Sequence, residues 1–428
     1  MSRQSIIRAR KVALATVVTS AIVVPNSFPA FAQTNAGMMH MIELLQSQIL
    51  ELKEKVRKNE EAAKEAAEGT MELPPKVARS GKKEIELKIS GQVNRAALIY
   101  DDGDRGDVLF VDNDNSSTRL KFQGKGKIDD MWSAGANFTV QFESNSTQDV
   151  NQEQEQGRSA DNFRQRKLEF WVDHKKLGRL WLGQGSEAVD GIAESDLSGT
   201  GLAGHSDIDD NAGGLNFVND GTNDLSGIRI PDVFTNLDGG RDDRIRYDTP
   251  TFAGIKVSAA AIADSEYDVA GTFNNSFGDL KVKAGIGYAW ENTDSKIEKF
   301  LGSASVLHKP TGLSVSVSGG VQEDTNSSDS DRDDEHYIYG KLGYQANFFT
   351  IGKSAFSIDY YDGDNIDVND DDSDAYGFQF VQKIDPVAME YTLVSGTTST
   401  MRLGLTWTMC SPSSPAPASS SRVGSRSI

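Results

Sequence analysis

Alternation of apolar and polar residues dominates the chain from residue 85 onward. In the first such segment the apolar residues share one parity and the polar residues the other: Ile85, Leu87, Ile89, Val93, Ala97 and Ile99 against Glu86, Lys88, Ser90, Gln92 and Asn94. Successive side chains of a strand point to opposite faces, so this period of two predicts a β-strand. The period recurs at residues 119–125, 132–142, 167–173, 179–184, 244–248, 255–262, 267–273, 280–290, 300–307, 313–321, 337–344, 355–361, 375–382 and 388–394. The sequence therefore predicts an all-β fold.

The connections between the predicted strands alternate in length. Short turns such as residues 250–254, 276–279 and 309–312 alternate with long loops rich in Asp, Asn and Ser. This alternation is typical of a barrel that meets lipid with its apolar face and lines water with its polar face. A soluble sandwich would bury the apolar face and would seldom carry so many charged residues in register on the other. We therefore predict a transmembrane antiparallel β-barrel over residues 85–399.

A period of seven precedes the strands. Apolar residues recur at alternating spacings of four and three: Met38, Ile42, Leu45, Ile49, Leu52 and Val56. This heptad predicts a coiled-coil helix within residues 33–70, followed by a proline-containing linker at residues 71–84. Self-association explains the heptad better than the alternative, an amphipathic helix packed on its own barrel. Isoleucine and leucine at the two core positions of the heptad favour a coiled coil of two helices.

The first 32 residues have the pattern of a secretory signal. A basic start precedes the apolar residues 12–24, and Ala30, Phe31 and Ala32 form a cleavage site, so the mature protein is expected to be exported. No later segment has the ~20 apolar residues that a membrane helix needs. With 63 acidic against 44 basic residues and a net charge of −19, no basic surface suggests nucleic acid as a partner. The single cysteine, Cys410, cannot pair within the chain.

One long connection, residues 187–242, interrupts the alternation. Its acidic residues are Glu187, Asp190, Glu194, Asp196, Asp207, Asp209, Asp210, Asp220, Asp224, Asp232, Asp238 and Asp242, against only two basic residues, Arg229 and Arg241. Ordinary connections have a handful of residues, so a connection of this length is either disordered or functional. Its place between two well-patterned strands favours a functional loop.

Four stretches of the chain carry a family resemblance. They read ELKISGQVNRAALIYDDGD, SSTRLKFQGKGKI, FRQRKLEFWVDHKKLGRLWLGQG and DRIRYDTPTFAGIKVSAA; the most specific pieces are LGQG at residues 182–185 and RYDTP at residues 246–250. Over roughly residues 85–394 the chain resembles the general porins of Gram-negative bacteria, most closely their alphaproteobacterial branch. The coiled coil is not part of the minimal pattern of that family.

The resemblance implies a sixteen-stranded barrel in the outer membrane that lets small hydrophilic solutes and ions diffuse passively. It implies a homotrimer in contact with outer-membrane lipid and lipopolysaccharide, without a cofactor. It also implies that residues 187–242 are the third external loop, which folds inward and narrows the channel.

Strand parity identifies candidates for the walls of this constriction. The basic residues expected on the polar, water-facing side are Arg119, Lys121, Lys125, Lys167, Arg244 and Arg246. An acidic loop across the lumen would confront this basic wall and create a transverse field that selects solutes by charge and dipole. The first candidates within the loop are Asp207, Asp209 and Asp210, followed by Glu194 and Asp196. For each of these residues the simpler interpretation is a solvated side chain away from the narrowest point.

The chain from residue 400 to residue 428 departs from the strand pattern. Fifteen predicted strands do not close an even-numbered barrel, and residues 411–421 are a run of Ser, Pro and Ala. Barrels of the family end in a strand with a terminal aromatic residue, whereas this chain ends at Ile428. Suppose that the third base of each codon is read together with the first two bases of the next codon. The codons of Trp407 and Thr408 then necessarily encode Asp, and those of Met409 and Cys410 encode Val. The same shift permits a strand-like end with a terminal Phe. We therefore interpret residues 400–428 as an out-of-frame replacement of the last strand; the alternative is a natural Ser/Pro tail.

Other classes of function fit the sequence less well. None of the five histidines lies in a nucleophile motif, so we do not expect an enzyme. The Asp-rich residues 329–335 and 362–374 lack the ordered ligand spacing of a calcium loop, and we interpret them as solvated external loops rather than metal sites. The alternative function is structural: the coiled coil would tether the barrel to the envelope or to a periplasmic partner.

Overall fold

The structure is a computed structural model that describes residue 54 and residues 85–103, 105–157, 162–219, 222–292, 296–324, 333–366, 369, 371–398 and 402–412. The chain divides into two units, Met1–Pro74 and Pro75–Ile428. Apart from Glu54, the predicted signal peptide, coiled-coil helix and linker lie outside the described residues, as do residues 413–428. Within the described part of the chain, no helix has the length and apolar character needed to cross a membrane.

The second unit is built from strands. They are β1 (Ile85–Asp101), β2 (Gly106–Asp112), β3 (Arg119–Lys127), β4 (Trp132–Phe142), β5 (Phe163–His174), β6 (Gly178–Ser186), β7 (Asn216–Val218), β8 (Leu225–Arg229), β9 (Arg241–Asp248), β10 (Ile255–Ile262), β11 (Glu266–Phe277), β12 (Leu280–Asn292), β13 (Lys296–His308), β14 (Leu313–Asp324), β15 (Glu335–Phe349), β16 (Gly352–Asp364), β17 (Asp372–Ile384), β18 (Met389–Thr398) and β19 (Arg402–Pro412). Short helices are η1 (Asp114–Ser116), η3 (Asp209–Asn211), α3 (Ile230–Val233), η4 (Ala263–Ser265) and η5 (Asp385–Val387).

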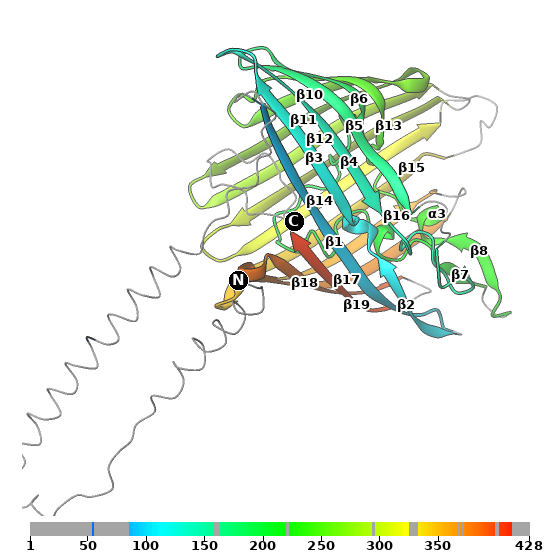
Figure 1. The fold of residues 1–428 in the computed structure, drawn as a ribbon. Helices are drawn as coiled ribbons and strands as arrows, with labels where there is room; N and C mark the ends of the chain where they lie inside the picture. The colour runs from blue at the N-terminus through cyan, green and yellow to red at the C-terminus, as the bar shows by residue number, and fades with distance from the viewer. Residues whose placement is uncertain are drawn as a thin grey trace, which may run out of the picture. The chain divides into compact units, whose positions relative to one another are not determined.

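Sixteen of the described strands, β1, β3 to β6 and β9 to β19, follow one another in a single antiparallel sheet (Figure 1). Strand β19 pairs with β18 and also with β1, so the order of pairings returns to the first strand. Strand β2 pairs with the second half of β1, and β7 and β8 form a separate small hairpin. The predicted all-β antiparallel architecture of about sixteen strands is therefore confirmed.

The two faces of this sheet differ in polarity and in exposure. In β14, Ser314, Ser316 and Ser318 are 4%, 3% and 6% exposed, whereas Val315 and Val317 are each 51% exposed. A sheet of a soluble protein shows the reverse, with its apolar side chains buried. The same exposure of apolar residues recurs on β1, β5, β9, β12 and β15, at Ile89, Phe170, Ile245, Ile286 and Ile338. The strand parities expected from the sequence are thus those of the structure.

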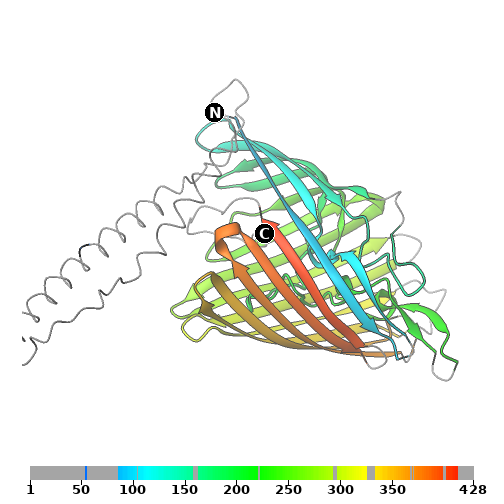
Figure 2. The same ribbon diagram turned by 60° about the horizontal axis from the view of Figure 1, so that its bottom comes forward.

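Residues 187–240, which we call the inner loop, cover the polar face of the sheet. They contain η3, the β7–β8 hairpin and α3. Their backbone and side chains bond to β11, β13, β15 and β16, which lie far along the chain. Figure 2 shows part of the loop, in green, running among the strands, and in Figure 1 its β7–β8 hairpin extends beyond them. We call the face that contacts this loop the inner face.

The last strand corrects an expectation from the sequence. No strand was expected after residue 400, yet β19 spans Arg402–Pro412. It pairs with residues 92–101 of β1 on one side and residues 390–397 of β18 on the other. The reason is visible in the sequence, where Leu403, Leu405, Trp407 and Met409 keep the period of two. Two open sheet edges supply partners for this short alternating segment. The interpretation of residues 400–428 as an out-of-frame replacement of the last strand stays a prediction.

Candidate functional site

Three of the predicted wall residues hold the base of the inner loop. On β9, Arg244 forms an ion pair with Glu169 of β5 and donates to the Ser186 carbonyl oxygen at 2.9 Å. Its neighbour on the same face, Arg246, donates to the Glu187 carbonyl oxygen at 2.5 Å and to the Asp248 carboxylate at 2.8 Å. Lys167 of β5 donates to the Ser186 hydroxyl. These cations therefore fix the point at which the chain leaves β6 and turns inward.

The first arm of the inner loop follows the inner face from β11 to β13. The Val189 N–H donates to Asp268 at 2.8 Å, the Ser195 N–H to Ser303 at 3.0 Å, and the Leu197 N–H to Ser305 at 3.0 Å. Buried backbone donors need such partners, because leaving one unpaired costs about 1–3 kcal/mol. The polar inner face is thus a template for the loop backbone.

Asp238, near the end of the inner loop, binds the backbone of this first arm. Its carboxylate accepts from the backbone N–H groups of Gly191 at 2.5 Å, Ile192 at 2.9 Å and Ala193 at 3.1 Å. Burial, followed by the charges of Glu194 and Asp190, raises the pKa of Asp238 well above its usual range. The two ends of the inner loop are therefore joined by one carboxyl group.

Two glycines of the inner face make room for the loop. A Cβ atom added at Gly287 of β12 would lie 2.7 Å from Val189, and one added at Gly343 of β15 would lie 2.5 Å from Ser198. Distances this short require a neighbour to move. Larger residues at these strand positions would push the loop away from the sheet.

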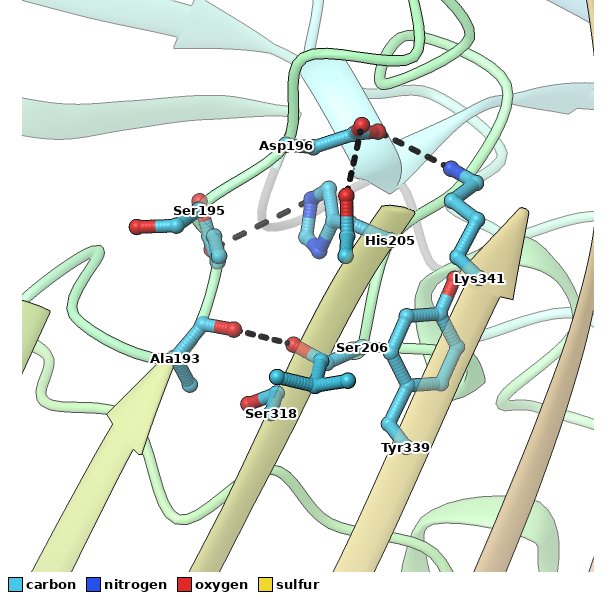
Figure 3. A pocket seen from close by; sticks show the side chains of 11 residues that line it. Ala193, Ser195, Asp196, His205, Ser206, Ser318, Tyr339 and Lys341 are labelled. Atoms are coloured by element: carbon cyan, nitrogen blue, oxygen red, sulfur yellow. Dashed lines mark hydrogen bonds and ion pairs between the residues drawn. The ribbon is translucent and has the colours of Figure 1, made fainter. Parts of the chain in front are cut away.

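An ion pair joins the middle of the inner loop to β15 (Figure 3). The Lys341 ammonium lies 2.9 Å from the Asp196 carboxylate and donates to the Gly204 carbonyl oxygen at 2.5 Å. The Lys341 side chain is 0% exposed, and Asp196 also accepts from the Ser198 N–H at 2.6 Å. Burial alone would raise the pKa of Asp196, but the charge of Lys341 and the bonds from Ser198 hold it below its ordinary value. Asp196 is thus a paired anchor of the loop.

His205 and Glu194 lie beside this anchor. The His205 Nε2 atom is 3.9 Å from the Glu194 carboxylate, and both side chains are largely buried. The adjacent Ser206 hydroxyl donates to the Ala193 carbonyl oxygen at 2.8 Å, which ties the outgoing and returning parts of the loop together. Ser316, Ser318 and Tyr339 complete a small pocket around this group (Figure 3).

The aspartates at the tip of the loop lie against the segment between β4 and β5. The Thr147 hydroxyl donates to the Asp210 carbonyl oxygen at 2.6 Å, and the Gln148 amide donates to the Asp209 carboxylate at 3.0 Å. Burial, followed by the charges of Asp209 and Asp210, raises the pKa of Asp207 well above its usual range. The three predicted aspartates are therefore brought together by η3.

The remaining predicted wall residues share the inner face of β3. Arg119 is buried and donates to the Ser116 hydroxyl at 2.6 Å. Lys121 is half-buried, and Lys125 is exposed near the opposite end of the strand. These three cations therefore extend along the strand instead of gathering at one level.

An apolar cluster stiffens the returning arm of the loop. Leu215, Ile230, Phe234 and Leu237 are buried against residues of the inner face and of β2, namely Leu98, Tyr100, Leu109, Val111, Tyr337, Tyr339 and Tyr361. The Tyr361 hydroxyl donates to the Thr235 carbonyl oxygen at 2.7 Å and accepts from the Thr235 N–H at 3.0 Å. The loop is a packed element with its own core.

Two residues that hold the inner loop, Lys341 and Asp238, were not identified from the sequence. Lys341 has a usable signal, because it is a lone cation among the inward positions 337, 339, 341 and 343 of a predicted strand. Asp238 has none, because its three partners lie 45 to 47 residues away.

Comparisons with known proteins agree with this architecture. A model of the Gram-negative porin family matches residues 63–397. An anion-selective porin from Comamonas acidovorans superposes with a TM-score of 0.52 at 12% identity, covering 77% of this chain and 100% of that chain. OmpT of Vibrio cholerae expressed in the outer membrane gives 0.52 at 11% identity, covering 79% of this chain and 100% of that one. These identities support the fold alone. No curated protein matches the chain.

Proposed function

The chain belongs to the Gram-negative porin family, and from this premise we propose that its strands form a transmembrane barrel in the outer membrane. Small hydrophilic solutes and ions would diffuse passively through its water-filled lumen. Family and fold indicate a channel rather than an enzyme.

The observation that carries this proposal is the inverted polarity of the sheet. Apolar side chains are exposed on the outer face of strand after strand, while serines, glutamines and charged residues are buried on the inner face. Lipid would cover the exposed apolar residues, and water would solvate whatever part of the inner face the loop leaves open. The period-two pattern of the sequence and the burial in the structure support the same orientation.

The proposed constriction lies between the inner loop and the inner face of β3, β5 and β9. Contacts of the loop with β11, β13, β15 and β16 occupy the other side of the lumen. Of the predicted residues, Asp207, Asp209 and Asp210 stay candidates for the acidic edge, and Lys121 and Lys125 for the basic wall. Asp196, Arg244 and Arg246 we propose instead as anchors of the loop.

Conductance of the refolded protein tests the proposal. Added to a planar lipid bilayer, the protein should produce stepwise increases in ionic current, which detergent alone does not produce. A properly refolded protein that conducts no ions would refute the channel. The reversal potential under a salt gradient then measures ion preference, and Asp209→Asn with Asp210→Asn should shift it toward anions if these residues line the narrow point.

We further propose that three copies associate in the membrane in contact with lipid and lipopolysaccharide, as the resemblance to porins implies. Light scattering of the detergent-solubilised protein measures the number of chains in the particle, and a monomeric mass would exclude the trimer. The alternative tethering function depends on the predicted coiled coil, which lies outside the described residues, and no observation here favours it.

A further inference from the structure

The strands end at two rims that differ in charge. One rim is formed by short turns, at residues 128–131, 175–177, 249–254, 278–279, 309–312, 350–351 and 385–388. The connections at the other rim include all the long ones, such as residues 102–118 and 143–162. We call these the turn rim and the loop rim.

Lysines of the inner face cluster at the turn rim. Lys281 and Lys353 are the second residues of β12 and β16. Lys281 shares its parity with Lys283, whose ammonium donates to the Glu194 carbonyl oxygen of the inner loop at 3.4 Å. Lys353 shares its parity with the buried Ser357, which bonds to Thr200 of the loop at 2.7 Å. Both lysines therefore point to the side of the sheet that holds the loop.

These lysines are not neutralised by neighbours on the strands. In the described part of the chain, neither Lys281 nor Lys353 forms an ion pair. The charges that act on Lys353 are those of Lys383 and Lys281, followed by the opposite charge of Asp385 in the neighbouring turn. Lys383 is paired with Glu390 at 2.8 Å. Lys256 lies 4.0 Å from Asp248, which is already bonded to Arg246. The inner face near the turn rim is therefore net positive.

The loop rim has the opposite charge. Exposed carboxylates there outnumber exposed cations among the described residues, and they include Asp101, Asp107, Asp224, Asp242, Asp243, Asp264, Asp333, Asp334 and Asp372. Several other acidic groups at this rim already have cationic partners, such as Asp190 with Arg241 and Glu291 with Lys299. The net charge of the exposed side chains at this rim is thus negative among the described residues.

We infer that the channel carries opposite fixed charges at its two mouths and therefore rectifies ionic current. This inference rests on the proposed porin function. The acidic mouth concentrates cations and the basic mouth concentrates anions, because fixed surface charge raises the local concentration of counter-ions. When the applied potential is positive on the side of the loop rim, cations enter the lumen from the loop rim and anions enter from the turn rim. Each kind of ion then comes from the mouth where it is enriched, and conductance is high. With the opposite voltage both are withdrawn, and conductance is low.

Current–voltage curves of channels of known orientation test the inference. The turn between β7 and β8 projects from the inner loop, and Thr222 in it is exposed. A Thr222→Cys variant in a Cys410→Ser background can be labelled with biotin, so that streptavidin added to one chamber reports which rim faces it. At 0.1 M KCl, where screening extends over about 10 Å, we expect about twofold more current with the loop rim positive. At 1 M KCl, where it extends over about 3 Å, the two currents should become nearly equal.

Paired variants identify the charges responsible. Lys281→Gln with Lys353→Gln should remove most of the asymmetry at 0.1 M KCl. Lys175→Gln with Lys176→Gln removes the same charge from an exposed turn of the same rim and should leave most of it. Conducting channels with equal currents at both polarities, with the opposite sign, or with an asymmetry unaffected by the first pair would overturn the inference and leave the porin function intact. Absence of any conductance would overturn both.

Discussion

Lys341 connects the middle of the inner loop to the sheet through a buried ion pair. Its ammonium bonds to a carboxylate and a carbonyl oxygen of the loop, and its side chain is 0% exposed. Removing one partner of a buried ion pair leaves the other charge uncompensated and costs about 3–5 kcal/mol. The middle of the loop is therefore held by a strand residue that the sequence presents as an ordinary lysine.

Lys341→Met should loosen the inner loop at Asp196. We expect a lower melting temperature and larger fluctuations of the open-channel current, because the unpaired Asp196 carboxylate is then more stable in contact with water. The double variant with Asp196→Asn should recover part of the loss, since it removes the uncompensated charge, and a double-mutant cycle separates the two contributions. A single variant that melts and conducts like the wild type would show that the pair does not hold the loop.

Glu187 makes the stability of the loop base depend on pH. Burial, opposed by a hydrogen bond from Gly240 and reinforced by Asp268, raises its pKa from 4.5 to about 7. The folded state therefore binds a proton more tightly than the unfolded state, so this contribution to stability is present below pH 4.5 and declines to nothing as pH rises to about 7.

Glu187→Gln should consequently raise the melting temperature at pH 8.5 and change it little at pH 4. The side chain is partly exposed, so solvent screening limits the gain to the order of 1 kcal/mol. Glu153→Gln, at an exposed position of an external segment, serves as the control and should change neither value. An equal effect of Glu187→Gln at both pH values would contradict the assignment.

At the scale of elements, the inner loop packs closely on strand β15 because a glycine of this strand leaves room for it. Gly343 faces Ser198 of the loop, whereas Gly340 in the same strand has no atom within 4 Å of an added Cβ. Gly343→Val should displace the loop and change the single-channel conductance. Gly340→Val makes the same change on the other parity and should leave conductance unaltered. Identical conductance of the two variants would show that the loop does not rest on this strand.

The strands could be predicted from sequence because each carries its own period. Their ends were less well predicted: the segment expected at residues 337–344 is part of β15, Glu335–Phe349, because pairing continues where the apolar alternation stops. The short strands β2, β7 and β8 were not predicted at all, since they depend on neighbours rather than on local pattern. For the same reason the sequence located the acidic loop but not its anchors: the partners of Asp196 and Asp238 lie 145 and 45 to 47 residues away.

At the scale of the whole molecule, β19 determines whether the circle of pairings is complete. It bonds to β18 and β1, and without it both edges would be exposed. A chain ending at Pro412 should therefore refold and conduct like the full chain. A chain ending at Thr398 should not, because two unpaired strand edges favour aggregation. Heat-resistant electrophoretic mobility and bilayer conductance measure the difference. Normal folding of the shorter chain would mean that β19 is dispensable.

The pairing of β1 with β19 also dictates an order of events during assembly. These strands are more than 300 residues apart in sequence, so their junction is a contact of very high sequence separation and is expected to form slowly. The contacts of the inner loop with β11, β13, β15 and β16 have smaller sequence separations, of 79 to 157 residues, and are therefore expected to form before that junction. We therefore expect the final strand to join a sheet on which the inner loop is already docked.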